Sequence, residues 1–170
     1  MCIRDRGGGP GIDCLAKYPA CTGWNEPAGN PARFDGISTT RSEIGMGKIT
    51  DGTSKTVLAG EKYLNPNFYA TGGSCVDNNA PTQGNDWDVN RWFPSFRKGS
   101  RTVQFEQLRR PMRDTPGFEN CTERFGSAHG AAVQMVYCDG SVHNIEYGVE
   151  IAVYAALGSR NGEEAFSSAE

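Results

Sequence analysis

Residues 125–146 read FGSAHGAAVQMVYCDGSVHNIE, and the alternation within this stretch decides the fold. Two strand-like segments flank a short turn. If the turn is the three-residue loop 138–140, Val133 opposes Ile145, and the apolar side chains gather on one face while the polar ones lie on the other. A two-residue turn would mix polar and apolar side chains on the same face. The sequence therefore predicts an antiparallel hairpin with a three-residue loop.

The Asp-Gly pair in this turn has a structural explanation. Gly140 occupies the third loop position, which requires a left-handed backbone that glycine adopts at little steric cost. The carboxylate of Asp139 can accept hydrogen bonds from the amides of its own turn. His129, which precedes the first strand, is expected to fix the entrance of that strand by bonding a nearby loop carbonyl. We interpret all three residues as structural.

The same stretch also holds the residue types of a hydrolytic site, since Ser127 precedes His129 and Cys138 adjoins Asp139. Nucleophilic catalysis requires the nucleophile and the base to lie within hydrogen-bond reach of each other. About nine extended residues at ~3.3 Å each separate His129 from the turn, so these groups do not meet. No carboxylate nearby in the sequence is placed to orient the imidazole. We therefore expect the protein not to be an enzyme.

The segments around the hairpin complete an α+β pattern. Residues 57–64 form an extended run that ends at an Asn-Pro turn signal. Before this run, Thr50 or Asp51 is expected to cap a single helical turn, and Asp51 and Gly52 are interpreted as structural. After the hairpin, a short helix is predicted to end at Gly158. Its predicted buried face consists of Val149, Val153, Ala156 and Leu157.

Residues 65–124 are poor in aliphatic side chains and are expected to form a long loop insertion. Asp86, Asp88 and Asn90 place oxygen atoms at alternate positions, which makes them a candidate calcium site. The spacing lacks the glycine and the distal glutamate of an EF-hand, and pairing of the carboxylates with Arg91 is the simpler explanation.

Two tryptophans in the same insertion are candidate binding residues. Trp87 and Trp92 could grip a glycan or another ligand, while packing of both rings against the sheet is the alternative. No other cofactor is expected.

The composition indicates a loop-rich domain with a thin core. Leu, Ile, Val and Phe make up about 17% of the 170 residues, and the chain has 22 Gly and 9 Pro. The net charge of -3 comes from scattered charges, so nucleic acid is not expected as a partner. Such a chain is expected to lack part of its own hydrophobic partner surface.

The beginning of the chain differs from the rest. MCIRDR matches the translation of a transposon end used in preparing sequencing libraries, so residues 1–6 are expected to be an artefact and the natural chain to begin upstream. Residues 7–33 predict irregular coil, residues 34–166 the folded domain, and residues 167–170 a tail. The remaining cysteines form no C-x-x-C pair, so zinc is not predicted and disulfide pairing stays open.

Several segments, taken in order, are similar to those of a known family. They are ITDGTSKTVLAGEK, GNDWDVNR, RDTPGF, RFGSAHGAA and VYCDGSVHNI, followed by a YAALGSRNGEE tail. Together they resemble the large planctomycete family of pilin-like proteins with an H-x9-DG signature. Here His129 is the histidine and Asp139-Gly140 is the DG, and the similarity covers residues 34–166.

The resemblance implies a prepilin-type protein related to the pseudopilins of type II secretion. In that fold an N-terminal helix packs against an antiparallel sheet, and we expect the helix to lie upstream of this sequence and one face of the sheet to be bare. It also implies a structural subunit of the cell envelope, on the periplasmic or extracellular face and anchored in the inner membrane by the helix. Its partners would be other pilin-like subunits or the secretion machinery. The alternative function is an extracellular glycan- or ligand-binding module that uses residues 65–124.

Overall fold

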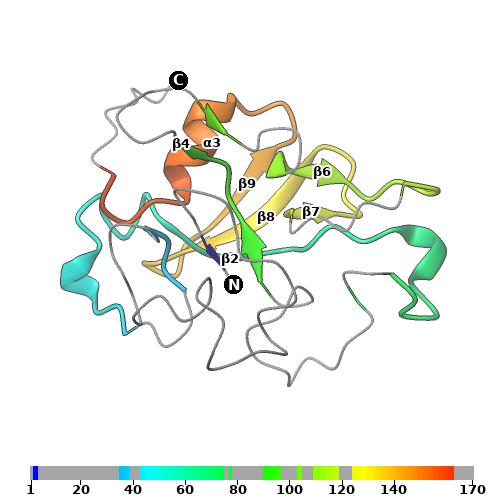
Figure 1. The fold of residues 1–170 in the computed structure, drawn as a ribbon, viewed down its shortest axis with the longest axis horizontal. Helices are drawn as coiled ribbons and strands as arrows, with labels where there is room; N and C mark the ends of the chain where they lie inside the picture. The colour runs from blue at the N-terminus through cyan, green and yellow to red at the C-terminus, as the bar shows by residue number, and fades with distance from the viewer. Residues whose placement is uncertain are drawn as a thin grey trace, which may run out of the picture.

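An antiparallel sheet of three strands lies at the centre of the fold (Figure 1). Its strands are β2 (Val57–Gly60), β8 (Ala132–Tyr137) and β9 (Val142–Glu146), in the order β2-β8-β9. The computed structural model describes residues 2–3, 35–38, 43–74, 77, 90–96, 103–104, 109–118 and 124–162.

The hairpin of β8 and β9 has the predicted register. Val133 pairs with Ile145, and the amide of Tyr137 donates to the carbonyl of Ser141 at 2.8 Å. Gly140 has a φ of +88°, in the left-handed region where glycine is favoured. The prediction of a three-residue loop, made from the separation of polar and apolar faces, is confirmed.

The inner face of the sheet carries the hydrophobic core. Side chains that alternate along β8 point into it and meet aromatic rings from distant segments. The fully or nearly buried members are Val57, Phe93, Phe125, Val133, Met135, Tyr137 and Tyr154. The ring of Phe93 lies 4.9 Å from that of Phe125 and 4.6 Å from that of Tyr154, measured between centroids. Aromatic rings from three segments therefore make up much of a core that is short of aliphatic side chains.

The predicted C-terminal helix is α3 (Ile151–Leu157), and it ends at Gly158 as expected. The predicted buried face is only partly right, because Tyr154 and Ala155 are the fully buried residues and Val153 is half-buried. The helix turns its largest side chain toward Phe93. A Cβ on Gly158 would lie 2.5 Å from the Phe93 ring, so this close approach requires glycine.

Short elements surround the sheet. They are β1 (Cys2–Ile3), η1 (Met46–Lys48), η2 (Pro66–Phe68), β3 (Arg91–Trp92), β4 (Ser95–Phe96), β5 (Val103–Gln104), β6 (Met112–Arg113) and β7 (Gly126–Ser127). β1 and β3 pair in parallel, as do β6 and β7, whereas β4 and β5 are antiparallel. The insertion at residues 65–124 thus carries short strands where the structure describes it, and Phe93 anchors it to the core.

The outer face of the central sheet is open to solvent. Leu58 is 41% exposed and Val142 is 62% exposed, and Val136 lies half-buried between them on the middle strand. At the other end of this face the exposed side chains are polar, as in Gln134 and Asn144. The expected bare face is present, but it is apolar only at the end near the Asp-Gly turn. Within the described parts of the chain, no helix has the length and apolar character needed to cross a bilayer.

Candidate functional site

The side-chain carboxylate of Asp139 stabilises the Asp-Gly turn in which it lies. Asp139 Oδ1 accepts from the amide of Ser141 at 2.9 Å and from its hydroxyl at 2.6 Å. Donation from the hydroxyl and then from the amide lowers the pKa of Asp139. The turn is also fixed from outside, because the amides of Cys138 and Asp139 donate to the carbonyls of Thr56 and Thr53 at 2.9 and 3.2 Å. The carboxylate therefore acts as a turn acceptor.

His129 lies at the opposite end of β8, beside a carboxylate that the sequence did not reveal. Its Nε2 is 3.4 Å from Oε1 of Glu61, and its side chain is 60% exposed. The other carboxylate oxygen of Glu61 accepts from the amide of Gln134 at 2.8 Å. The ring was expected to bond a loop carbonyl. Instead it faces Glu61, which immediately follows β2 and is brought close by the β2-β8 pairing.

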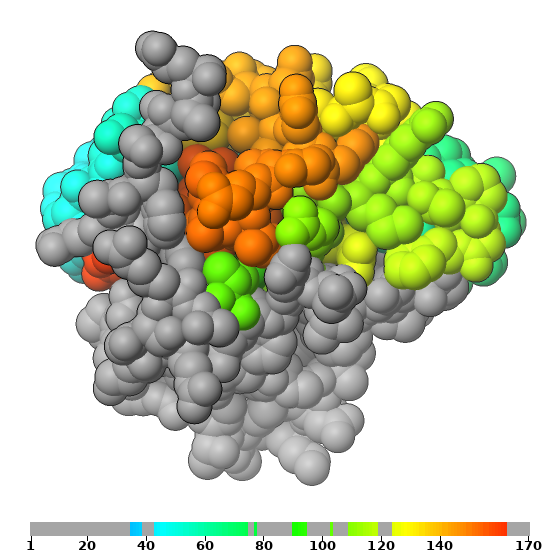
Figure 2. Space-filling model, turned by 90° about the horizontal axis from the view of Figure 1, so that it is seen from above, coloured from blue at the N-terminus to red at the C-terminus, as the bar shows by residue number. Residues whose placement is uncertain are grey.

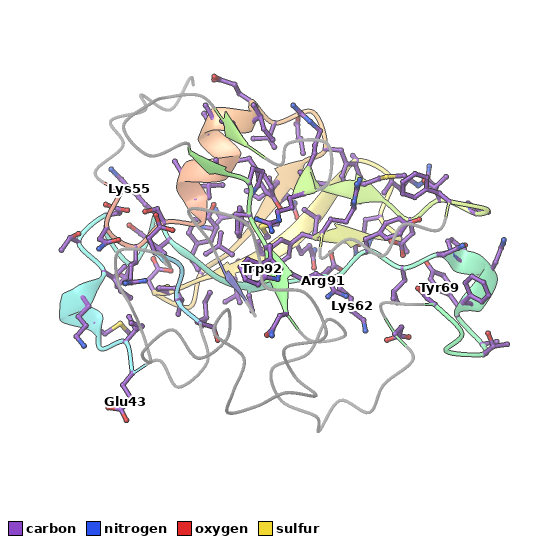
Figure 3. All side chains as sticks on the ribbon, viewed as in Figure 1. Glu43, Lys55, Lys62, Tyr69, Arg91 and Trp92 are labelled. Atoms are coloured by element: carbon purple, nitrogen blue, oxygen red, sulfur yellow. The ribbon has the colours of Figure 1, made fainter. Side chains whose placement is uncertain are left out.

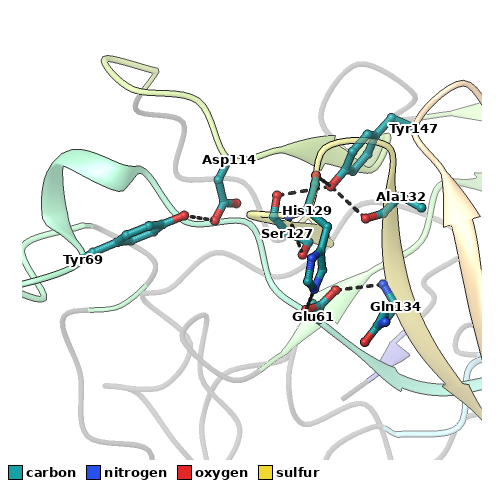
Figure 4. A network of polar contacts seen from close by, with 8 residues as sticks. All are labelled: Glu61, Tyr69, Asp114, Ser127, His129, Ala132, Gln134 and Tyr147. Carbon is teal, nitrogen blue, oxygen red and sulfur yellow. Dashed lines mark hydrogen bonds and ion pairs between the residues drawn. The ribbon is translucent and has the colours of Figure 1, made fainter.

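Tyr147 closes the turn that contains His129 (Figure 4). Its hydroxyl lies 3.2, 2.9 and 3.1 Å from the carbonyl oxygens of Ser127, His129 and Ala132. Burial, followed by the charges of nearby carboxylates, raises the pKa of Tyr147, so the hydroxyl keeps its proton and remains a donor. Within the turn, the amide of His129 donates to Oγ of Ser127 at 3.2 Å. The hydroxyl of Tyr147 thus lies at the centre of the loop at 127–131 and holds it through the loop's backbone carbonyls.

A second tyrosine and carboxylate lie nearby (Figure 4). The hydroxyl of Tyr69 donates to Asp114 Oδ2, and Asp114 Oδ1 accepts from the amide of Leu64 at 2.9 Å. Burial and then the bond to Asp114 raise the pKa of Tyr69 to about 12. This pair ties the segment after β2 to the segment after β6. Sequence reasoning missed Glu61, Tyr69, Asp114 and Tyr147. Of these, Tyr147 directly follows the hairpin stretch 125–146, and this position is the signal that could have found it.

The groups of the hydrolytic interpretation lie apart. β8, which runs from Ala132 to Tyr137, separates His129 from Cys138 and Asp139. Cys138 is 8% exposed, and burial, followed by the charge of Asp139, raises the pKa of its thiol. A raised pKa disfavours the thiolate that attacks substrates. Ser127 is also buried, and its Oγ accepts from a backbone amide. The arrangement favours holding a turn in place over activating a nucleophile.

Asp51 and Gly52 lie in a segment, residues 51–56, that is joined by hydrogen bonds to the distant residues 159–162. The amide of Asp51 donates to the carbonyl of Arg160 at 3.1 Å, and its Oδ2 accepts from the amide of Gly162 at 2.8 Å. Thr56 Oγ1 donates to the carbonyl of Ser159 at 3.0 Å. The helical turn that Thr50 or Asp51 was expected to cap is not present, because no helix lies between η1 and β2. Thr50 Oγ1 instead lies 3.4 Å from the carbonyl of Arg160, in the same segment after α3. Gly52 has a φ of +102°, which suits glycine.

The candidate calcium and ligand-binding residues are only partly within the described structure. Asp86, Trp87 and Asp88 lie outside the described residues. Asn90 is 1% exposed and Trp92 is 4% exposed, and the guanidinium of Arg109 lies 5.0 Å from the Trp92 ring centroid.

Figure 3 places Trp92 beside the central strands and Tyr69 on the outlying η2 segment. A ring as buried as Trp92 offers no open platform to a sugar, so of the two candidate tryptophans only Trp87, which lies outside the described residues, still fits the glycan interpretation. Within the described residues there is no group of three or more His, Cys, Asp or Glu side chains that could hold a metal ion.

The sequence matches a protein family over most of its length. Residues 15–151 match a family described as "Protein of unknown function (DUF1559)". No curated protein and no solved structure matches the chain.

Proposed function

The chain belongs to the DUF1559 family, and from this premise we propose that it is a non-enzymatic, pilin-like subunit of the cell envelope. The subunit is anchored in the inner membrane by an apolar helix encoded upstream and displays the described domain on the periplasmic or extracellular face. Its partners are other pilin-like subunits or components of a type II secretion system. Its role is structural.

The observation that carries this proposal is the open outer face of the β2-β8-β9 sheet. Soluble proteins usually leave large apolar side chains scattered singly, whereas Leu58, Val136 and Val142 lie together on adjacent strands of this face. A helix or a neighbouring subunit that covers this end of the face would remove Leu58 and Val142 from water. The thin core and the family membership support the same conclusion.

The signature residues support a structural role as well. His129 and Asp139 lie at opposite ends of β8, and each is engaged with its own turn or with an adjacent strand. An active site would need them, or one of them with a nucleophile, to face a shared substrate.

The test uses the full-length gene, including its upstream sequence. We expect that sequence to encode about 20 apolar residues, the length needed to cross a bilayer. We also expect the protein to fractionate with the membrane and to crosslink to other envelope subunits. Leu58→Glu should keep the membrane anchor and lose at least about tenfold in crosslinking, because a carboxylate must then be desolvated at the contact.

Gln134→Glu is the matched control, since Gln134 lies on the same face and is already exposed. It should crosslink like the wild type. An upstream sequence without an apolar segment, or a Leu58→Glu variant that crosslinks at the wild-type level, would contradict the proposal.

A further inference from the structure

β9 is an edge strand of the central sheet, because the order β2-β8-β9 gives it one neighbour. The hydrogen bonds at the two ends of the hairpin fix which backbone groups face that neighbour. The amide of Tyr137 donates to the carbonyl of Ser141 at 2.8 Å, and the amide of Tyr147 donates to the carbonyl of Ala131 at 3.4 Å. In an antiparallel pair the bonded positions alternate. The amides and carbonyls of His143 and Ile145 therefore face β8.

The backbone groups of the remaining β9 residues, Val142, Asn144 and Glu146, point away from the sheet. Among the described residues the only hydrogen bond they make is at the Glu146 carbonyl, which accepts from the amide of Val149 at 3.1 Å. All three residues are exposed. Figure 2 shows the yellow and orange residues of the hairpin and the following turn along one rim of the molecule.

Proline, lysine and β-bulges usually prevent edge strands from pairing, and this edge has none of them. Residues 142–146 read VHNIE and contain no proline, lysine or arginine. The β8–β9 register is continuous, whereas the other edge strand, β2, has a register shift between Val57 and Ala59. A regular strand is a template for strand addition, and apart from the Glu146 carbonyl the outward amides and carbonyls of β9 have no hydrogen bond among the described residues.

We propose that β9 pairs antiparallel with β9 of a second copy of this chain, about a twofold axis at Asn144. The three outward-facing residues lie symmetrically about Asn144, so this register pairs Val142 with Glu146 of the second copy and Asn144 with Asn144. It places His143 opposite Ile145, and no charged group lies opposite a like charge. Two three-stranded sheets thereby become one continuous sheet.

A second copy fits this edge better in that register than in its neighbours. A twofold axis at His143 would leave the end of β9 unpaired and bring two imidazoles together. The axis at Asn144 engages all five residues and pairs two side-chain amides that can bond each other. Because so short an edge buries less than the roughly 1,200 Å² of stable complexes, we expect a dissociation constant in the high micromolar range for the isolated chain.

The test is sedimentation of the 170-residue chain over a concentration series. The wild type should form dimers as its concentration rises, and hydrogen exchange at the amides of Val142, Asn144 and Glu146 should slow in parallel. Asn144→Lys places two ammonium groups together at the axis and should weaken association at least tenfold. Gln134→Lys is the matched control, because Gln134 pairs directly with Asn144 on the central strand and has no free edge. It should dimerise within about twofold of the wild type.

A crosslinking experiment tests the register. Asn144→Cys should form an intermolecular disulfide on mild oxidation, since backbone-bonded partners lie about 5.5 Å apart at Cα. Val142→Cys should not, because its partner is Glu146. Equal crosslinking at the two positions, a dimer that Asn144→Lys leaves unchanged, or a wild-type chain that stays monomeric at millimolar concentration would overturn the proposal. None of these results bears on the pilin-like role, which is tested at Leu58.

Discussion

Replacing Tyr147 with phenylalanine is the sharpest test of how the histidine-containing turn is held. The substitution removes one hydroxyl and keeps the ring that packs against the core. In the wild type, this hydroxyl lies 3.2 Å from the carbonyl of Ser127, 2.9 Å from that of His129 and 3.1 Å from that of Ala132. One proton makes one strong hydrogen bond at a time, so the loss is a single shared bond and not three.

The expected magnitude follows from that count. A hydrogen bond between neutral groups contributes about 1 kcal/mol net, and a carbonyl left dry costs about 1–3 kcal/mol. Ser127 is buried but His129 is exposed, so water can reach only part of the vacated site. We therefore expect Tyr147→Phe to lower the free energy of unfolding by about 1–2 kcal/mol. For a chain of this length, that loss lowers the melting midpoint by about 3–6 °C.

The assay is thermal and urea unfolding of the wild type and the variant, with hydrogen exchange at residues 128–131 as a local readout. Tyr69→Phe is the matched control, because it removes the same atom from a ring that is 52% exposed. Its hydroxyl bonds a single carboxylate at the surface, so its effect near neutral pH should be about 0.5 kcal/mol, and it should leave hydrogen exchange at residues 128–131 unchanged. A Tyr147→Phe variant that melts with the wild type, or one no less stable than Tyr69→Phe, would refute this account of the turn.

Three further results are expected. Gly126→Ala should destabilise the fold by about 3 kcal/mol or more. The added Cβ would lie 2.3 Å from the carbonyl oxygen of Met112 and 2.7 Å from Cβ of Tyr63. A soluble variant with the wild-type melting midpoint would contradict this prediction. The pKa of Tyr69 rises from 10.0 to about 12 on folding. The stability that its hydroxyl adds is therefore full below pH 10 and is lost by about pH 12. In alkaline unfolding curves, the stability difference between the wild type and Tyr69→Phe should shrink over this interval. The pKa of Asp139 falls below 3.8 on folding. The contribution of its carboxylate to stability is therefore present above pH 3.8 and is lost as the pH drops through the lower folded pKa. Asp139→Asn should flatten the acid limb of the plot of melting midpoint against pH, and an unchanged limb would exclude a stabilising role for the carboxylate.

The parts of the fold that the sequence predicted are local. The hairpin register followed from the alternation of polar and apolar residues, because a shift by one residue would have moved every side chain of β9 to the other face. The left-handed Gly140 and the end of α3 at Gly158 followed from turn and capping preferences. Each of these depends on neighbours within a few positions along the chain.

The parts that it did not predict depend on distant segments. The pairing of Glu61 with His129 joins residues that are adjacent only because β2 lies beside β8. The buried side of α3 was set by Phe93, which comes from the insertion, so the spacing of aliphatic residues within the helix gave an incomplete face. Asp51 had the right chemistry for a helix cap, but the amide it accepts from belongs to Gly162.

Three segments of the sequence that resembled the family in different places converge on one end of the sheet. In the segment 53–56, the carbonyls of Thr56 and Thr53 accept hydrogen bonds from the amides of Cys138 and Asp139 in the Asp-Gly turn. The same segment and the adjacent Asp51 bind residues 159–162, which follow α3. Strand, turn and helix are thereby locked into one unit, in which these motif residues hold one another. Because those contacts join the motif residues to one another, we expect substitutions at two other surfaces of the described residues, the outer face at Leu58 and the edge at Asn144, to weaken assembly without weakening folding.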